Sequence, residues 1–385
     1  MSYLEKYKTG SCLFRTLSEA RMRLQAARNA LRYSYPAPVA LIGVHDSGND
    51  GSYKKCTDSS PIPIENTSVV IPAEASRILE THTPATYPES FIFRLHNGHV
   101  LGDGTVVTPK NKILSESTTD FHRKQKYHHL IYERRVPAPE RFNGRLAVIT
   151  SPGSDNYFHW TLASLPRLNL LNDMDDEIDA YYIDCSSRFH QEWISMLGIS
   201  ENKIIAAAPN RHIEADELIV PSFAGLPSLP TPAGLDFLRN FIPPHSKGRR
   251  LYISRAGARR RRILNEEVLP PVLQKYAFET IEPGRMTVKQ QMETFASASV
   301  IIAPHGAELT NLAFCSAGTQ VIEMFSPYYL NPCFKQLAAV RGLRHTALVG
   351  KGGTRVVRKQ LDAHHVWANI NIDALALETA LATML

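Results

Sequence analysis

The chain has 385 residues, a formal net charge of +6 and a hydrophobic content of 43%. This hydrophobic fraction excludes a disordered chain, and the length suits two α/β domains better than one. The excess of 43 basic over 37 acidic residues favours an anionic partner but does not separate nucleic acid, a phosphorylated substrate and a membrane surface. The five cysteines are scattered without a C-x-x-C pair, which indicates reduced thiols and argues against a zinc ribbon or finger.

The N-terminus and the apolar runs indicate where in the cell the protein is expected. No apolar run is long enough to span a bilayer, and the N-terminus lacks the uninterrupted apolar core of a signal peptide. We therefore expect a soluble, cytoplasmic protein. Residues 1–35 predict a helical segment in which arginines alternate with leucines. This segment is either a surface helix packed on the domain or a basic amphipathic helix in peripheral contact with the inner face of a membrane.

Residues 36–240 predict an N-terminal domain in two parts. The first part, to about residue 140, is rich in Pro, Gly, Ser and His and predicts an irregular β-rich region with strands at 68–71, 90–95 and 105–108. From Arg145 strands and helices alternate. The predicted strands are 146–150, 180–184, 204–208 and 217–221, and the predicted helices are 157–171 and 189–197.

Residues 241–350 predict a second alternating domain, followed by a C-terminal tail and helix in residues 351–385. The predicted strands of this domain are 251–254, 278–281, 300–303, 321–325 and 345–349, with helices at 265–276, 288–298, 309–314 and 331–340. The closing helix is predicted at 372–385. Two such series predict two parallel sheets that are covered by helices on both faces.

The strand at 300–303 ends on Pro304-His305-Gly306, directly before a predicted helix. Open parallel sheets bind ligands at the carboxyl ends of their strands. Glycine lets a ligand approach the backbone, and the free N–H groups at the start of a helix attract anions. His305 and Gly306 therefore predict a phosphate site; the alternative is a tight turn whose histidine is bonded to the backbone.

A basic run covers residues 247–262 and contains no acidic residue. Arg255 leaves the strand 251–254 at its carboxyl end, on the edge where His305 is expected. Guanidinium groups match phosphate oxygens two at a time, so we expect Arg255 to bind the same anion. Arg249, Arg250 and part of 259–262 are predicted to form a solvated basic surface.

Glu323 interrupts the apolar strand 321–325. A carboxylate inside a buried strand is costly unless it is paired or holds a ligand. Two roles remain open: accepting hydrogen bonds from ribose hydroxyls, or forming an ion pair with one of the arginines.

The stretch NYFHWTLASLPRL, residues 156–168, carries the candidate general bases. The loop after strand 146–150 supplies capping groups, and His159 falls in the first turn of the following helix. The positive end of a helix disfavours an imidazolium, so a neutral His159 can accept a proton. Asp155 is the second candidate base. The alternative is that His159 has only a structural role.

Metal and nucleotide motifs of other kinds give no competing site. Asp173-Met174-Asp175 is a D-x-D, but it stands at the amino end of a predicted strand, where we expect a solvated loop. G-x-G-x-x-G, G-x-x-x-x-G-K-[ST] and H-E-x-x-H do not occur in the sequence. The basic run lacks interleaved aromatic residues, so we expect no nucleic-acid partner.

In sequence the chain resembles glycosyltransferase family 61, as a bacterial-type soluble member, from about Arg145 to Pro327. The resemblance is carried by LYISR, RRRILNEEVL and the stretch FETIEPGRMTVKQQMETFASASVIIAPHGAELTNLAFCSAGTQVIEMF, and by NYFHWTLASLPRL with its Asn156, His159 and Pro166. It implies a GT-B architecture, in which two Rossmann-like domains face each other across a cleft. The C-terminal domain would bind a nucleotide sugar, and the domain at 36–240 would bind the acceptor.

The resemblance also implies an activity and a donor site. Known members use UDP-sugars such as UDP-GlcNAc or UDP-xylose, invert the anomeric carbon and are not built around a D-x-D metal site. Carried over, the diphosphate contacts are Arg255, His305, Gly306, Thr310 and Asn311, and Glu323 reaches the ribose. We expect no metal cofactor, and a glycan or lipid-linked acceptor in polysaccharide biosynthesis.

Glu308 stands where the family usually has glycine. A carboxylate close to a diphosphate is unfavourable unless it points at sugar hydroxyls or at an arginine. The alternative function is therefore a non-catalytic nucleotide- or polyanion-binding protein in which Glu308 marks a lapsed transferase site.

Overall fold

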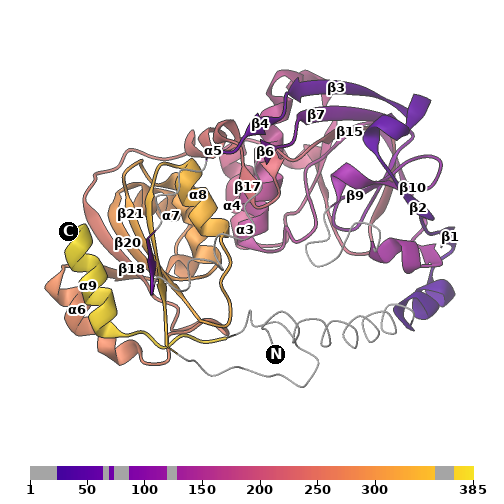
Figure 1. Ribbon diagram of the computed structural model, residues 1–385. Coiled ribbons are helices and arrows are strands. Elements are labelled where there is room, and N and C mark those ends of the chain that lie inside the picture. Colours follow the sequence, from indigo (N-terminus) through magenta and orange to yellow (C-terminus); the bar gives the residue numbers. More distant parts are fainter. Residues whose placement is uncertain (1–23, 64–68, 73–85, 119–127, 352–367) are drawn as a thin grey trace. The chain divides into compact units, whose positions relative to one another are not determined.

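The computed structural model describes residues 24–63, 69–72, 86–118, 128–351 and 368–385 (Figure 1). The chain divides into two compact units: unit 1 comprises Met1–Ser60 and Tyr87–Pro230, and unit 2 comprises Pro61–Thr86 and Thr231–Leu385. The sequence placed this division after residue 240 and did not predict that the chain enters unit 2 early and returns. Residues 1–23 of the predicted helical segment and 352–367 of the predicted tail lie outside the described residues.

Unit 1 is built on a mixed sheet of ten strands. Its parallel part runs in the order β14 (Ile204–Ala206), β13 (Ala180–Ile183), β12 (Glu140–Val148) and β15 (His212–Pro221). The first half of β15 pairs antiparallel with β8 (His99–Leu101) and its second half with β7 (Ser90–His96). The β-rich part and the alternating part of this unit therefore share one sheet, because a long strand offers backbone partners to both.

The remaining strands of this sheet come from the β-rich region. They are β2 (Ala40–Ile42), β3 (Gly51–Thr57), β9 (Thr105–Val107) and β10 (Lys112–Leu114). A single buried cluster holds Phe93 and Val100 from this region together with Leu146, Tyr182 and Leu218 from the parallel strands. Smaller strand pairs are β1 (Tyr35–Pro36) with β11 (Arg135–Val136) and β16 (Gly225–Leu226) with β17 (Leu229–Pro230).

The helix predicted at 157–171 is a run of three helical types. It begins as α3 (Tyr157–His159), widens to the π-helix η7 (Trp160–Ser164) and ends as the 3-10 helix η8 (Leu165–Glu177). Pro166 has no N–H to donate, so a regular α-helix cannot continue through it. The next helix, α4 (Arg188–Leu197), ends at Gly198, which has a left-handed φ of 69°.

Unit 2 contains a six-stranded parallel sheet. The strand order is β19 (Glu279–Ile281), β18 (Arg249–Ile253), β20 (Ala298–Pro304), β21 (Gln320–Phe325), β22 (Arg344–Val349) and β5 (Val69–Ile71). The sequence assigned the strand at 68–71 to the β-rich region of the first domain. The structure corrects this assignment, because β5 pairs with β22 at the edge of the unit 2 sheet.

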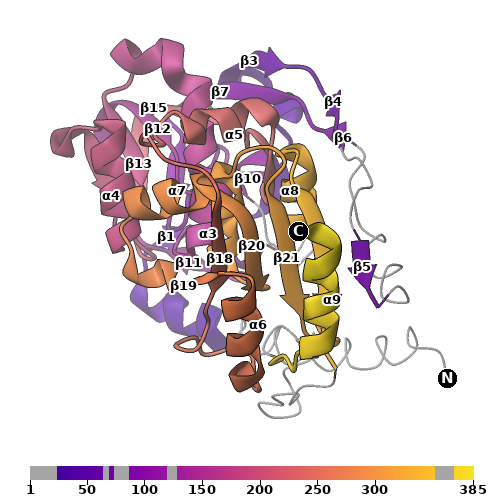
Figure 2. The ribbon, with the colours of Figure 1, turned by 90° about the vertical axis from the view of Figure 1, so that its left-hand side faces the viewer.

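Helices cover both faces of the unit 2 sheet. Figure 1 shows α6 (Leu269–Lys275) and α9 (Ala374–Met384) on one side of the strands, and α7 (Val288–Ala296) and α8 (Cys333–Val340) on the other. In Figure 2, α6 and α9 lie in front of the strands. Leu377 and Leu381 of α9 belong to the same buried cluster as Ile322 and Leu348. The closing helix is therefore part of the unit 2 core and not a separate tail.

Two shorter helices complete the described part of unit 2: α5 (Pro232–Arg239) and the 3-10 helix η12 (Ala307–Phe314). The predicted α/β class is confirmed, since both units combine parallel strands with covering helices. No helix among the described residues has the length and apolar character needed to cross a membrane.

Candidate active site

Arg255 and His305 lie at the carboxyl ends of two neighbouring parallel strands in unit 2. Arg255 follows β18 and His305 follows β20, and these two strands pair directly. Both residues are buried, with exposed fractions of 8% and 5% for the whole residue. The structure therefore brings these two predicted residues to one edge of the sheet, where open α/β sheets hold ligands.

Gly306 is the point at which the two segments touch. A Cβ atom built on it would collide with the guanidinium of Arg255 and with the carboxylate of Glu308. Its φ of −179° is an extended conformation that any residue can adopt. A side chain at this position would displace the ends of the Arg255 and Glu308 side chains.

Glu308, in the first turn of η12, forms an ion pair with Nη1 of Arg255. The carboxylate therefore points at an arginine, which is one of the two orientations expected from the sequence. Nη2 of Arg255 donates to the carbonyl of Arg260 at 3.2 Å. Its Nε is buried and has no hydrogen-bond partner among the described residues. A buried donor of this kind can bond to a water or to a ligand oxygen.

Arg261 also joins this cluster, although the sequence did not single it out. Its backbone has a positive φ of 55°, and its guanidinium lies 5.7 Å from the ring centre of Tyr329. Burial lowers the pKa of Arg261 to about 10, and the charge of Arg255 acts in the same direction. No sequence signal separates Arg261 from its neighbours in a run of four arginines. Arg261 is distinguished from them only by the turn of the loop at its positive φ.

Two other arginines of the basic run have partners of their own, and two more are exposed. Arg249 forms an ion pair with Glu279 at 2.7 Å, and Arg250 donates to the carbonyl of Tyr276 at 2.7 Å. Arg259 and Arg262 are exposed. This distribution matches the expectation that most of the run forms a basic surface.

Glu323 lies behind His305 and is completely buried. Its Oε1 accepts from Nδ1 of His305 at 2.5 Å, and its Oε2 lies 2.8 Å from Nε2 of His345 on β22. Burial alone would raise the pKa of Glu323, but the two imidazoles outweigh it and lower the pKa. The partners are two histidines, so the ion pair with an arginine that the sequence suggested is not found among the described residues. The contact with a ribose stays a prediction.

Thr310 and Asn311 are also buried within η12. Oγ1 of Thr310 has no partner among the described residues. The side-chain amide of Asn311 donates to Oε1 of Gln291 at 2.8 Å and to the carbonyl of Glu308 at 3.1 Å. Asn311 thus fixes η12 to α7, whereas the resemblance had implied a contact with the diphosphate.

The two candidate bases belong to unit 1. Asp155 is exposed in the loop that follows β12, and His159 is half-buried at the end of α3. Asn156 caps this helix, because its side chain accepts from the N–H of Phe158 at 2.9 Å. Both candidates therefore stand at the carboxyl edge of the parallel strands of their unit, as the sequence predicted.

Arg167 secures this edge from within. Its side chain is fully buried and donates to the carbonyls of Ile149, Thr150 and Pro221 at 2.6–3.1 Å. These carbonyls follow β12 and close β15, so one guanidinium ties two neighbouring strand ends together. Burial without a carboxylate partner lowers the pKa of Arg167 to about 9.

Asp103 is a candidate base that the sequence did not reveal. It stands in the turn between β8 and β9, and Gly104 of this turn, with a φ of 96°, packs on the carbonyl of Thr150. Burial raises the pKa of Asp103, and Oγ1 of Thr105 donates to its Oδ1 at 3.0 Å. A Gly-Asp-Gly turn predicts only a hairpin. The proximity to β12 arises from the pairing of strands distant in sequence.

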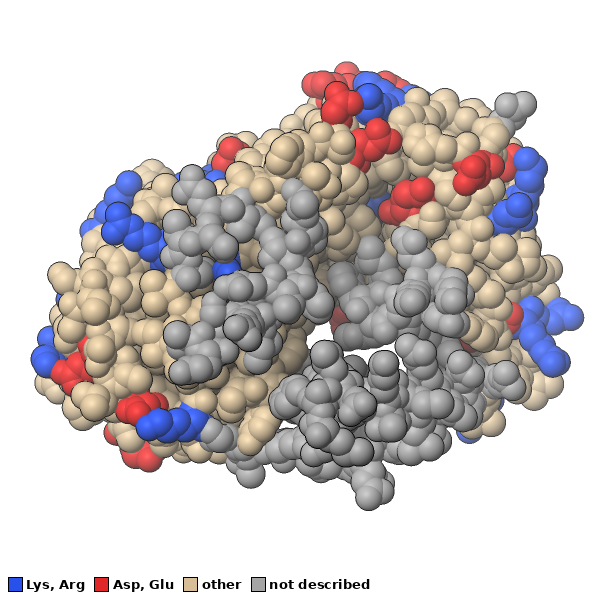
Figure 3. All heavy atoms as spheres, viewed as in Figure 1, with Lys and Arg blue, Asp and Glu red and all other residues tan. Residues whose placement is uncertain are grey.

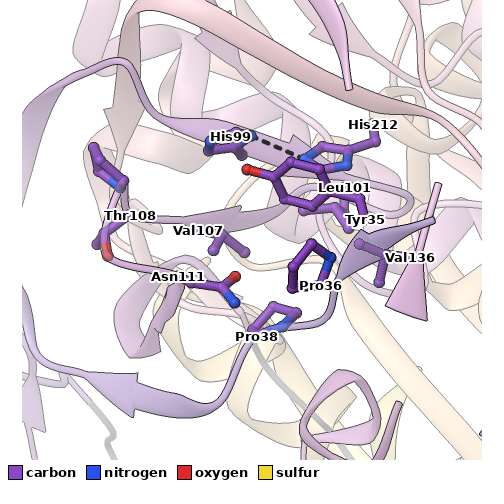
Figure 4. A pocket seen from close by; sticks show the side chains of 11 residues that line it. Tyr35, Pro36, Pro38, His99, Leu101, Val107, Thr108, Asn111, Val136 and His212 are labelled. Atoms are coloured by element: carbon purple, nitrogen blue, oxygen red, sulfur yellow. Dashed lines mark hydrogen bonds between the residues drawn. The ribbon is translucent and has the colours of Figure 1, made fainter. Parts of the chain in front are cut away.

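A pair of histidines lines a small cavity of about 10 Å³ at the opposite edge of unit 1 (Figure 4). Nδ1 of His212 lies 2.7 Å from the carbonyl of Pro137, and Nε2 of His212 lies 3.0 Å from Nδ1 of His99. Tyr35 packs edge-on against His212. Burial lowers the pKa of His212 to about 4 and also lowers that of His99. A cavity of this volume holds at most one water.

The described part of the chain contains no group of three or more His, Cys, Asp or Glu residues placed to hold a metal ion. The predicted helix that precedes the D-x-D extends to Glu177, so Asp173 lies on η8 and not in a loop. Its side chain is exposed, as expected.

Part of the chain that includes these residues is similar to a known protein family. Residues 157–322 match the family model described as Glycosyltransferase 61. The matched range begins beside His159 and ends on β21, so it includes Arg255, His305 and Glu308. This part of the chain is similar to glycosyltransferase family 61, which confirms the resemblance predicted from the sequence over these residues.

Two curated relatives are similar to a shorter stretch of the chain. They are the beta-1,2-xylosyltransferase RCN11 of Oryza sativa subsp. japonica and a beta-1,2-xylosyltransferase of Arabidopsis thaliana, each 35% identical over 65 residues. The similarity covers 17% of this chain and 12% of each relative. Both relatives are plant proteins, so the expectation of a bacterial-type member stays a prediction.

Proposed function

We propose that this chain is a glycosyltransferase whose unit 2 holds the diphosphate of a UDP-sugar at the carboxyl edge of its sheet. The observation that carries the proposal is the convergence of Arg255, Arg261 and His305 at that edge. Two guanidinium groups match the charge of a diphosphate and bind its oxygens in pairs. Nε of Arg255 and Oγ1 of Thr310, which have no partner among the described residues, offer further hydrogen bonds.

The reaction we propose is a single displacement with inversion. The oxygen of an acceptor hydroxyl forms a bond to the anomeric carbon while the bond from that carbon to the diphosphate breaks, and UDP leaves. The hydroxyl proton passes to His159 or Asp155, with Asp103 as a third candidate base. Arg255 and Arg261 stabilise the negative charge that develops on the departing diphosphate, so the reaction does not require a metal cofactor.

The proposal extends to architecture and substrates. We propose a GT-B arrangement in which unit 1 presents the acceptor, a glycan or lipid-linked saccharide, to the donor on unit 2. The names of the two relatives favour a pentose such as xylose over a hexose as the transferred sugar. With such acceptors, the protein would be cytoplasmic and would act in polysaccharide biosynthesis. Leu24 and Leu31, exposed by 59% and 93% beside Arg28 and Arg32, support peripheral contact with an anionic membrane.

The test separates donor binding from chemistry. UDP binding is measured by calorimetry and transfer by release of UDP from UDP-xylose and UDP-GlcNAc with glycan acceptors. Arg255→Ala should weaken UDP binding strongly, and His159→Ala should abolish transfer while UDP still binds. Arg249→Ala and His96→Ala remove exposed side chains of the same kinds in the same units and should change neither measurement. Full activity in both Arg255→Ala and His159→Ala would refute these roles.

One observation favours the second candidate, a non-catalytic nucleotide- or polyanion-binding protein. The Glu308 carboxylate forms an ion pair with Arg255 and offsets the positive charge that would otherwise attract a diphosphate. On the face shown in Figure 3, the described Lys and Arg side chains lie in small groups mixed with acidic ones, which does not favour a long nucleic acid. Thermal shifts with UDP, GDP, CDP-sugars and oligonucleotides discriminate the two. Stabilisation by oligonucleotides alone, reversed by salt, would support the second candidate.

A further inference from the structure

We propose that binding of a nucleotide sugar diphosphate to unit 2 takes up one proton from solvent onto Nε2 of His305, and that Glu323 and His345 prepare His305 for this proton. The inference rests on the proposed function and deepens it, because it assigns a protonation state to the donor complex. In this arrangement His305 contacts the ligand and His345 is a positioning residue that acts through Glu323.

The tautomer of His305 follows from its hydrogen bond. Nδ1 lies 2.5 Å from Oε1 of an ionised Glu323, so Nδ1 carries a hydrogen and donates it. In the neutral ring Nε2 then holds a lone pair and no hydrogen. Burial lowers the pKa of His305, which agrees with a neutral ring in the free protein.

A diphosphate changes this balance. The oxygens of a diphosphate diester at neutral pH are acceptors only, so a hydrogen bond from Nε2 requires a hydrogen that the neutral ring lacks. A diphosphate beside the ring brings negative charge, which favours the imidazolium. A proton from solvent then bonds to Nε2, and the ring donates to the carboxylate on one side and to the phosphate on the other.

The charged groups around His305 determine whether its ring can be stable in the protonated form. Glu323 faces the ring from β21. The positive charges of Arg255 and Arg261, in the segment after β18, lower the pKa of His305. Glu308 of η12 offsets one of the two guanidinium charges. The remaining ionisable neighbours are His345 from β22, Tyr329, which packs edge-on, and Cys333 at the start of α8, whose pKa burial raises so that the thiol stays neutral. The carboxylate is thus the partner for a new positive charge.

His345 supports the carboxylate from the other side. It holds Oε2 of Glu323 at 2.8 Å, and its own exposed fraction is 2%. A buried carboxylate with only one donor is less stable as an anion, and an uncharged Glu323 could not hold an imidazolium. Glutamine at position 345 can still donate to Oε2, whereas leucine cannot.

The experiment is calorimetric titration with UDP-xylose and UDP-GlcNAc, whose diphosphates are esterified at both ends and do not titrate near pH 7. Heats measured at one pH in buffers of different ionisation enthalpy give the number of protons taken up. The wild-type protein should take up close to one proton, and its affinity should fall about tenfold per pH unit over the pH range in which uptake is complete. His305→Gln should bind with no uptake and no pH dependence.

The His345 variants test the positioning role. His345→Gln should retain uptake, His345→Leu should lower both uptake and affinity, and His245→Gln in the same unit should match the wild type. Thermal unfolding of each variant establishes that it is folded. Binding of UDP-sugar by the wild type without proton exchange, or unchanged uptake in a folded His345→Leu variant, would overturn this inference. No binding of any nucleotide sugar by the wild type would instead overturn the proposed function.

Discussion

Glu308 neutralises Arg255 at the carboxyl edge of the unit 2 sheet. The Glu308 side chain is 27% exposed and the Arg255 side chain 7%, so the guanidinium is the more deeply buried partner of this ion pair. Gly306 leaves the space that both groups occupy. A ligand anion that binds Arg255 must therefore compete with a carboxylate of the protein itself.

We predict that Glu308→Gln strengthens UDP binding. The amide keeps the shape of the side chain but removes its charge, so Arg255 can give its full charge to the diphosphate. We expect about a tenfold decrease in Kd, equivalent to about 1.4 kcal/mol, measured by calorimetry at low salt. Glu279→Gln, which removes an exposed charge from the same unit, should have little effect. Weaker binding in Glu308→Gln would show that the carboxylate holds the ligand, for example through sugar hydroxyls.

We predict that Gly306→Ala weakens UDP binding in a folded protein, because it displaces the guanidinium of Arg255. The added methyl group would collide with Arg255 and Glu308, while the extended backbone at this position accepts alanine. Gly284→Ala is the matched control, because a Cβ at that position meets no atom within 4 Å. Calorimetry reports binding, and circular dichroism with thermal unfolding reports the fold. Normal binding by Gly306→Ala would contradict the packing of Arg255 on this backbone.

We predict that Arg167→Leu destabilises unit 1. Three carbonyls at the ends of β12 and β15 lose their donor, and buried carbonyls without partners cost about 1–3 kcal/mol each. We expect a loss of at least about 3 kcal/mol in the free energy of unfolding by urea, followed by the fluorescence of the buried Trp160 and Trp193. Arg188→Leu removes an exposed arginine of the same unit and should cost less than about 1 kcal/mol.

We predict that unit 1 loses stability in mild acid through His99 and His212. The folded-state pKa of His212 is about 4, below the ordinary value of 6.5, so the unfolded chain binds the proton first as pH falls. The contribution is present above pH 6.5 and is lost between pH 6.5 and about 4, and it is on the order of 3 kcal/mol.

Urea unfolding at several pH values tests this linkage. His212→Gln should flatten the decline of stability with acid, and the exposed His96→Gln should leave it unchanged. An equal acid slope in wild type and His212→Gln would rule the histidine pair out as its source.

The sequence by itself determined the α/β class and the sheet edge at which Arg255 and His305 lie. Alternating strands and helices predict parallel sheets, and the carboxyl ends of parallel strands share one edge. The sequence therefore predicts that Arg255 and His305 lie at the same edge of one sheet. The same argument placed Asp155 and His159 at the edge of unit 1.

Only the tertiary structure decided the partners of these residues. Glu323 meets His345 because β21 and β22 pair. Gly104, next to Asp103, approaches Thr150 because a hairpin joins a sheet whose other strands lie far along the chain. Arg261 enters the site through a turn with positive φ, and β5 joins unit 2 from a region that the sequence assigned to unit 1. Local patterns fix the type and direction of an element. Which distant strands pair depends on packing across the whole unit, and that packing leaves no signature in a short stretch of sequence.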